Sequence, residues 1–164
     1  MKWRALLAVA AALLVYWGAH AVLFAYSLPK YERIGPGVWV PYPDYAVEVR
    51  LDQMRISDVA ADFSGEMTVA TTGTSWVGVT LSVRRIEGVA DPSYCSFRVL
   101  GSGDHYWNTG LNDDSMRLCI NAWDEGSVQE TVWYAVPKSY LGEITGIAMP
   151  SAYTFETTPL LTWE

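Results

Sequence analysis

Apolar and polar side chains alternate along several segments of the chain, and this period of two is the feature that most limits the fold. In residues 75–85, SWVGVTLSVRR, the apolar residues Val77, Val79, Leu81 and Val83 alternate with small or polar ones. Because successive side chains of a β-strand point to opposite faces, the pattern predicts a strand with one buried face. The same alternation occurs in residues 45–52, 94–99, 118–120 and 128–136.

Glycine and proline separate these segments. Turn signals occur at Gly65, Gly73, Asp91-Pro92, residues 101–103 and Gly126. Shorter apolar runs near residue 147 and in residues 153–163 complete the set, and no segment after residue 30 shows a helical period. About seven short strands at this spacing predict an all-β, immunoglobulin-like two-sheet β-sandwich.

The segment from Val136 to Lys138 ends the last long strand. Pro137 has no backbone N–H to donate to a neighbouring strand, so regular pairing is expected to stop there. Residues 138–141 are expected to form a short turn. The apolar residues Tyr140, Leu141 and Ile144 are then expected to cover the open end of the sandwich.

An apolar segment precedes the domain. Residues 5–28 follow Lys2 and Arg4 and contain no Asp, Glu, Lys or Arg. At about 1.5 Å per residue this length spans about 36 Å, enough for a tilted bilayer crossing. We expect residues 1–28 to be an uncleaved signal anchor. It would be a single-pass transmembrane helix in the cytoplasmic membrane, with the N-terminus inside and the C-terminal domain outside.

A cleaved signal peptide is the alternative for the same segment. Residues 1–4 make a suitable basic region, and Ala19-His20-Ala21 has the small-x-small form of a cleavage site. The protein would then be secreted. Both alternatives place residues 30–164 outside the cytoplasmic membrane.

The remaining domain boundaries follow from composition. Residues 29–43 hold four prolines and two glycines, which fits an extended linker or, alternatively, an edge strand around Val38-Trp39-Val40. Residues 44–164 form the extracytoplasmic β-sandwich domain. The formal net charge of −7 disfavours contact with phosphate backbones, so we expect no nucleic-acid partner.

The two cysteines, Cys95 and Cys119, both lie in the part expected to be exported. Disulfides form in such oxidising surroundings, so a disulfide between them is expected, joining a strand at residues 93–100 to a strand at residues 117–123. Two separate buried thiols are the alternative. A redox or metal role would need a CxxC motif or further ligands, which the sequence lacks.

Two motifs resemble the immunoglobulin-like extracytoplasmic domains of the DUF4352 and MPT63-like type, found on bacterial lipoproteins and membrane-anchored proteins. GDHY (residues 103–106) fits the turn that ends one strand of these domains, and residues 126–137 fit a later strand ending in Val-Pro. The resemblance covers about residues 45–150 and implies a β-sandwich without a common catalytic site. The chain departs from it by having two cysteines and by lacking a lipobox cysteine, which implies a helical anchor.

Candidate chemistry is sparse in the domain. His105 is its one histidine, and its neighbours Ser102 and Asp104 are too close in sequence to converge as a triad. Oxygen ligands in residues 101–115 could bind Ca²⁺, but their spacing matches no EF-hand. We therefore expect no enzyme activity, no catalytic or metal site and no cofactor.

Aromatic residues supply the candidate interaction surface. It comprises Asp104, His105, Tyr106, Trp107, Trp123 and Trp133. Trp76, Trp123 and Trp133 fall on the strand face opposite the aliphatic residues. If that face is solvated they mark a binding patch, and if it is covered they pack within the domain. The expected function is binding of an envelope or secreted protein partner, as an interaction or accessory module. The alternative is a carbohydrate or small-ligand binding module, with or without calcium, and a hydrolase is the remaining alternative.

Overall fold

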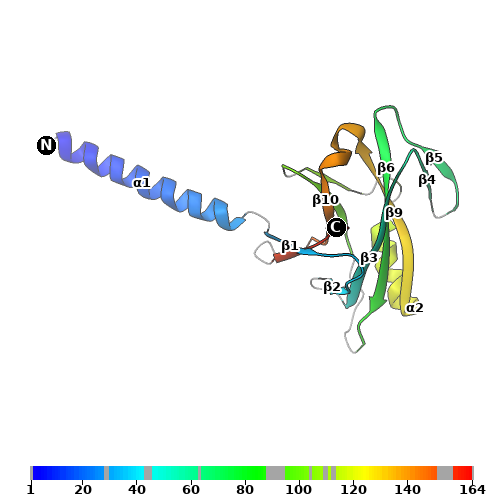
Figure 1. Ribbon diagram of the computed structural model, residues 1–164. Helices are drawn as coiled ribbons and strands as arrows, with labels where there is room; N and C mark the ends of the chain where they lie inside the picture. The colour runs from blue at the N-terminus through cyan, green and yellow to red at the C-terminus, as the bar shows by residue number, and fades with distance from the viewer. Residues whose placement is uncertain are drawn as a thin grey trace.

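The computed structural model describes residues 2–27, 30–42, 46–62, 64–87, 95–103, 105–108, 111, 114–150 and 157–163. Helix α1 (Lys2–Ser27) extends away from a β-rich domain (Figure 1). Its described side chains are all exposed, including the large apolar residues Leu14, Trp17 and Leu23. Within the described part of the chain, no helix is both long enough and apolar enough for a membrane crossing.

The β-strands form two sheets that pack as a sandwich, with a separate two-stranded ribbon (Figure 1). The first sheet has the order β1 (Lys30–Ile34), β11 (Thr157–Leu161), β10 (Ile144–Ala148), β7 (Arg98–Gly101), β8 (Tyr106–Trp107). The second has the order β2 (Val40–Pro41), β3 (Val47–Ser57), β6 (Thr74–Arg85), β9 (Ser127–Pro137). The ribbon pairs β4 (Val59–Ala61) with β5 (Met67–Val69). The prediction of a mostly β, sandwich-like fold is confirmed.

The segment 29–43 contributes a strand to each sheet. β1 pairs in parallel with β11, and β2 pairs antiparallel with the first half of β3. The backbone N–H of Gly37 also donates to the carbonyl of Leu51, at 3.0 Å. These hydrogen bonds hold the segment against the edges of both sheets.

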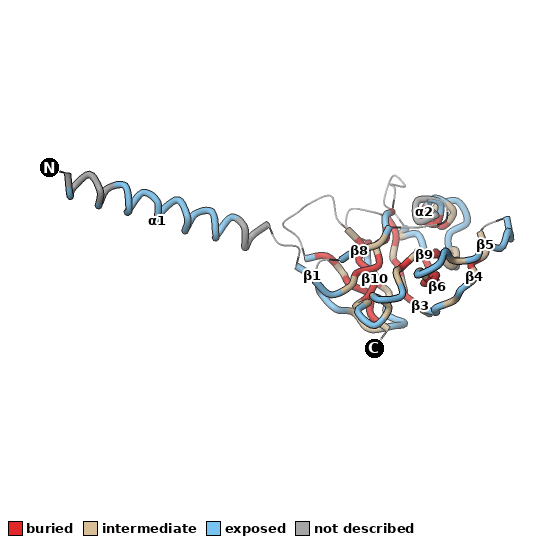
Figure 2. The backbone as a smooth tube through the Cα atoms, turned by 90° about the horizontal axis from the view of Figure 1, so that it is seen from above, coloured by how far each residue is buried: buried red, intermediate tan, exposed pale blue. Residues whose placement is uncertain are grey.

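The core lies between the inner faces of the two sheets. Val49, Val79 and Val132 from the second sheet meet Val99 and Ile147 from the first, and all five are fully buried. Figure 2 shows this buried layer in red, in contrast to the exposed α1. The alternation in the sequence therefore identified the correct inward faces of β3, β6 and β9.

A helix within the domain corrects the expectation that every element after residue 30 is β. Residues 117–123, read from the sequence as a strand, belong to α2 (Asp114–Glu125). Leu118, Cys119 and Ala122 are buried, and their i, i+1, i+4 spacing places them on one helical face. Ile120, which the strand reading placed inward, is 36% exposed. Two alternating apolar residues were too few to establish a period of two.

The predicted disulfide joins Cys95 to Cys119, with a Cα–Cα distance of 5.9 Å. Both residues are buried in the core cluster. Because Cys119 lies on α2, the bond fastens this helix to the segment before β7. It does not join two strands, as the sequence reading supposed.

The end of β9 follows the sequence prediction. Pro137 is its last residue, and a 3₁₀-helix, η1 (Lys138–Glu143), begins directly after it. The backbone N–H of Lys138 donates to the carbonyl of Gly73, at 2.9 Å. Tyr140, Leu141 and Ile144 are partly buried against the core. η1 therefore covers one end of the sandwich.

Candidate interaction surface

A tight β7–β8 hairpin carries three residues of the predicted surface. Its turn is closed by a hydrogen bond from the N–H of Gly101 to the carbonyl of His105, at 2.8 Å, and Gly103 has a φ of 65°. A Cβ on Gly101 would lie 2.8 Å from Cη2 of Trp107. Because Gly101 has no side chain, the Trp107 indole can lie across the hairpin at this position.

Three rings meet beside this hairpin, and we call His105, Trp107 and Tyr140 the ring cluster. The ring centroids of His105 and Tyr140 are 4.6 Å apart, with an edge-to-face angle of 72°. Trp107 lies 5.8 Å from Tyr140 and 6.4 Å from His105. Such edge-to-face and tilted contacts are the favoured aromatic geometries. The cluster therefore has a defined arrangement, held from two elements, β8 and η1.

Hydrogen bonds tie those two elements together. The backbone N–H of Ser102 donates to the carbonyl of Glu143, at 3.0 Å, and the Ser102 hydroxyl donates to the Glu143 carboxylate, at 2.6 Å. The Thr145 hydroxyl donates to the carbonyl of Leu100, at 3.2 Å. These bonds keep the hairpin turn at a fixed distance from η1, and so keep the ring cluster assembled.

Tyr106 neighbours Trp107 along β8 and pairs with Leu100, so its side chain lies on the face of the hairpin opposite Trp107 and is 55% exposed. The guanidinium carbon of Arg98 lies 5.1 Å from the centroid of the Tyr106 ring, within the range of a cation–π contact. We call His105, Tyr106, Trp107 and Tyr140, which come from both faces of the hairpin, the interaction surface. Tyr140 was absent from the surface predicted from sequence, because nothing local links it to residues 105–107.

The other predicted residues either lie elsewhere in the fold or lie outside the described residues. Trp123 lies on α2 beside Arg85, whose guanidinium carbon is 5.2 Å from the indole centroid. Arg85 is at the far end of β6 from Gly73 and η1. Asp104 lies outside the described residues, as do Asp113 and the side chain of Asp114 from the proposed calcium loop.

The structure corrects the prediction that Trp133 is a surface residue, because its side chain is buried. It is 4% exposed and packs with Trp76 and Ala60 on the outer face of the second sheet. The β4–β5 ribbon covers this face, which the sequence reading had allowed as the packing alternative for the tryptophans. The guanidinium carbon of Arg55 lies 4.7 Å from the centroid of the Trp133 indole.

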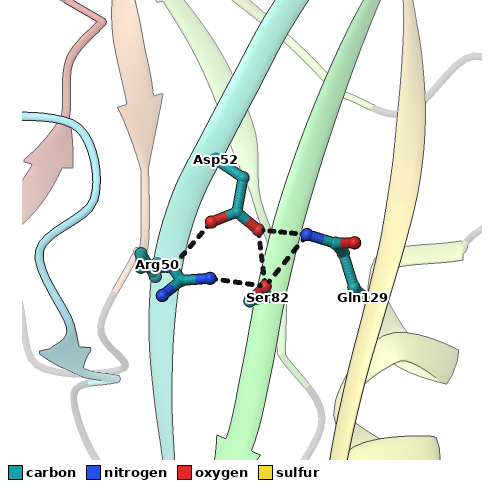
Figure 3. Close-up of polar contacts among 4 residues, drawn as sticks. All are labelled: Arg50, Asp52, Ser82 and Gln129. Atoms are coloured by element: carbon teal, nitrogen blue, oxygen red, sulfur yellow. Dashed lines mark hydrogen bonds and ion pairs between the residues drawn. The ribbon is translucent and has the colours of Figure 1, made fainter.

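A polar cluster crosses the same outer face, and we call it the clamp (Figure 3). Asp52 is the extra residue of a β-bulge, since Leu51 pairs with Leu81 and Gln53 with Thr80. Its carboxylate accepts hydrogen bonds from the Arg50 Nε at 2.6 Å, the Gln129 Nε2 at 2.7 Å and the Ser82 hydroxyl. The clamp thus links β3, β6 and β9 through one carboxylate.

The hydrogen bonds of the clamp to an ionised carboxylate suit a structural role. Burial tends to raise the pKa of Asp52, but the hydrogen bonds from Ser82, Gln129 and Arg50 outweigh it and hold the pKa below its ordinary value. A carboxylate that stays ionised is a weak base toward the Ser82 hydroxyl, and no histidine takes part. In the described residues, no group of three His, Cys, Asp or Glu side chains is placed to hold a metal ion.

Replacing Asp52 by asparagine is expected to lower the free energy of unfolding by about 1–2 kcal/mol at pH 7, since charged hydrogen bonds are lost. A lowered folded-state pKa stabilises the fold above the unfolded pKa of about 3.9 and loses that effect as the pH falls through the folded value. The difference between wild type and Asp52→Asn should therefore shrink below about pH 4. Urea unfolding at pH 7 and at acid pH measures both effects. Asp124→Asn, on an exposed position of α2, is the control. A difference that grows on acidification would contradict the assignment.

Comparison with known proteins supports the fold class. No protein-family model matches the chain, and a search among curated proteins gave no match. Among solved structures, an uncharacterized β-sandwich protein from Clostridium difficile 630 is similar, with a TM-score of 0.51 and 7% sequence identity. The similarity covers 84% of this chain and 97% of that one. At this identity it supports a sandwich fold and nothing about function.

Proposed function

We propose that the protein is a membrane-anchored, extracytoplasmic interaction module of immunoglobulin-like type that binds another envelope or secreted protein. The observation that carries this proposal is Tyr106, an aromatic side chain that is 55% exposed on a rigidly held hairpin. Tyrosine, tryptophan and arginine are enriched among residues that dominate binding energy in protein interfaces. Arg98 lies beside Tyr106, and Trp107 and Tyr140 of the ring cluster add two such residues on the other face of the hairpin.

The anchor belongs to the same proposal. Apolar side chains of α1 that are exposed to water would carry a large solvation cost, and a surrounding bilayer removes it. The uncharged run from residue 5 to residue 28, after Lys2 and Arg4, supports a crossing with the N-terminus inside. The Cys95–Cys119 disulfide suits the oxidising side of that membrane.

Capture by variant chains tests the interaction. The full-length protein in detergent, oxidised and tagged, serves as bait for a detergent extract of the source's own envelope. Tyr106→Ala is expected to weaken retention of the partner by about tenfold or more, because it removes an exposed ring from the interaction surface. Tyr31→Ala is the matched control, since Tyr31 is 40% exposed on β1, at the other edge of the first sheet.

Two outcomes would contradict the proposal. Equal retention of the same partner by wild type and Tyr106→Ala would exclude the interaction surface. Retention of glycan fragments without protein would favour a carbohydrate-binding module. Thermal unfolding of each variant separates loss of binding from loss of fold.

A further inference from the structure

The β4–β5 ribbon has two faces of opposite character. Its register pairs Val59 with Val69, Ala60 with Thr68 and Ala61 with Met67. Residues paired directly across a ribbon lie on the same face, and neighbours along a strand lie on opposite faces. One face therefore carries Ala60 and Thr68, and the other carries Val59, Ala61, Met67 and Val69. We call the second set the ribbon face.

The ribbon face is apolar and open to solvent. Ala60 is fully buried against Trp76 and Trp133, so its side of the ribbon packs on the domain. On the ribbon face, Met67 is 64% exposed and Val69 69% exposed, while Val59 and Ala61 are half-buried. The ordinary alternation would direct the threonine outward and the larger apolar residues inward. The reversal leaves Met67 and Val69 open to solvent beside the half-buried Val59 and Ala61, and an exposed apolar patch of this kind can mark an interface.

Carboxylates lie at the two ends of the ribbon. Asp62 and Glu66 flank the turn between the two strands, and Asp58 precedes β4; all but the half-buried Asp62 are exposed. The Asp62 carboxylate accepts hydrogen bonds from the Ser64 hydroxyl at 2.7 Å and the Glu66 N–H at 2.8 Å. The Ser64 bond is the main reason that the pKa of Asp62 lies below its ordinary value, so this group stays ionised. Lys138 pairs with Asp58, at 3.2 Å, which leaves Asp62 and Glu66 as an acidic pair at the turn end of the ribbon.

We propose that the ribbon face docks a protein segment that presents apolar side chains flanked by lysine or arginine. Apolar contact with Met67 and Val69 would supply burial, and the basic flanks would pair with Asp62 and Glu66. An anionic lipid surface would be repelled by the same carboxylates, and the ribbon stands on the far side of the domain from α1 in both views (Figures 1 and 2). A second copy would bring the acidic residues of two ribbons together.

The inference goes beyond the proposed function and rests on different residues. Both surfaces lie at the η1 end of the sandwich, since Tyr140 of η1 contacts His105 and Lys138 of η1 pairs with Asp58. A partner seated on the interaction surface could therefore extend onto the ribbon face. Substitutions can nevertheless disrupt each surface without changing the other.

Peptide binding followed by methyl NMR tests the inference. The full-length chain in phosphatidylcholine nanodiscs is titrated with the peptide Lys-Lys-Val-Thr-Val-Thr-Val-Lys-Lys and with a matched peptide in which every lysine is glutamate. The lysine peptide is expected to shift the methyl signals of Met67 and Val69 saturably. The glutamate peptide should bind at least about fivefold more weakly, because ion pairs are replaced by like-charge contacts.

Variants separate the contribution of apolar contact from that of the carboxylates. Met67→Gln with Val69→Thr should abolish the shifts, and Val69→Thr alone should weaken binding if the double variant fails to fold. Val38→Thr, at a 50% exposed position outside the ribbon, should bind as wild type does. Asp62→Asn with Glu66→Gln should reduce the preference for the lysine peptide. Tyr106→Ala should leave peptide binding unchanged, so that a failure here is distinguishable from a failure of the proposed function.

Several results would overturn the inference. No saturable shift at the ribbon methyls, or equal binding of both peptides, would show that the ribbon face does not select a basic apolar segment. Concentration-dependent shifts of the same signals without peptide would identify a second copy as the occupant. Broadening of these signals by nitroxide-labelled lipid would identify the membrane.

Discussion

Replacing Gly78 by valine is expected to lower the free energy of unfolding by about 3 kcal/mol, the upper part of the range for overpacking a filled site. Gly78 lies in the middle of β6, paired with Arg55 on β3 and with Trp133 on β9. A Cβ there would lie 2.5 Å from Cζ3 and 2.8 Å from Cε3 of the Trp133 indole. The indole cannot move freely, because it packs against Trp76 and Ala60 beneath the ribbon and contacts Arg55 on the sheet.

Urea unfolding of the oxidised protein measures this effect. Gly35→Ala is the matched control, because a Cβ at Gly35 has nothing within 4 Å. It should stay within about 0.5 kcal/mol of wild type, as surface substitutions do. If Gly78→Val were as stable as Gly35→Ala, Trp133 would not lie over β6. The finding that the outer face of the second sheet is covered would then be wrong.

Removing the disulfide is expected to cost a similar amount, about 3 kcal/mol, since it closes a loop of about 25 residues in the unfolded chain. Both sulfur atoms lie in the apolar core, where alanine is accepted without leaving a polar group unpaired. The double variant Cys95→Ala with Cys119→Ala should therefore fold, but with a lower midpoint in denaturant. The loss should be larger at α2 than at β6, because the bond holds the helix to the segment before β7.

Hydrogen exchange resolves that difference. Amide protons of α2 should exchange faster in the double variant, and those of β6 should keep their relative protection. Wild-type protein under reducing conditions is the control and should reproduce the loss. Equal stability of oxidised wild type and the double variant would contradict the pairing of Cys95 with Cys119.

The long central strands could be predicted from the sequence because their side chains alternate over many residues. Val77, Val79, Leu81 and Val83 predicted the inner face of β6, and the structure confirms it. α2 could not be read in the same way, since only Leu118 and Ile120 suggested a period. The helical signal was the adjacent pair Leu118 and Cys119 followed by Ala122, which becomes clear only once their burial is known.

The surface was harder to predict than the core. The hairpin residues His105, Tyr106 and Trp107 were recognised from their aromatic character, but Tyr140 joins them through η1, about 35 residues further along the chain. Trp133 was placed on a strand face opposite the aliphatic residues, which is correct. The sequence does not show that the β4–β5 ribbon folds over that face and buries it.

A photo-crosslink in intact cells of the source tests the account most directly. The full-length chain carries benzoylphenylalanine in place of Tyr106, or of Tyr31 as the control, and the cells are illuminated, treated with external protease and fractionated. The account predicts a discrete protein crosslink from position 106 and not from position 31. The product should be found in the membrane fraction, with its domain cleaved by the external protease. Absence of a crosslink at position 106, or a domain that remains protected from the protease, would contradict a membrane-anchored module that binds its partner outside the cell.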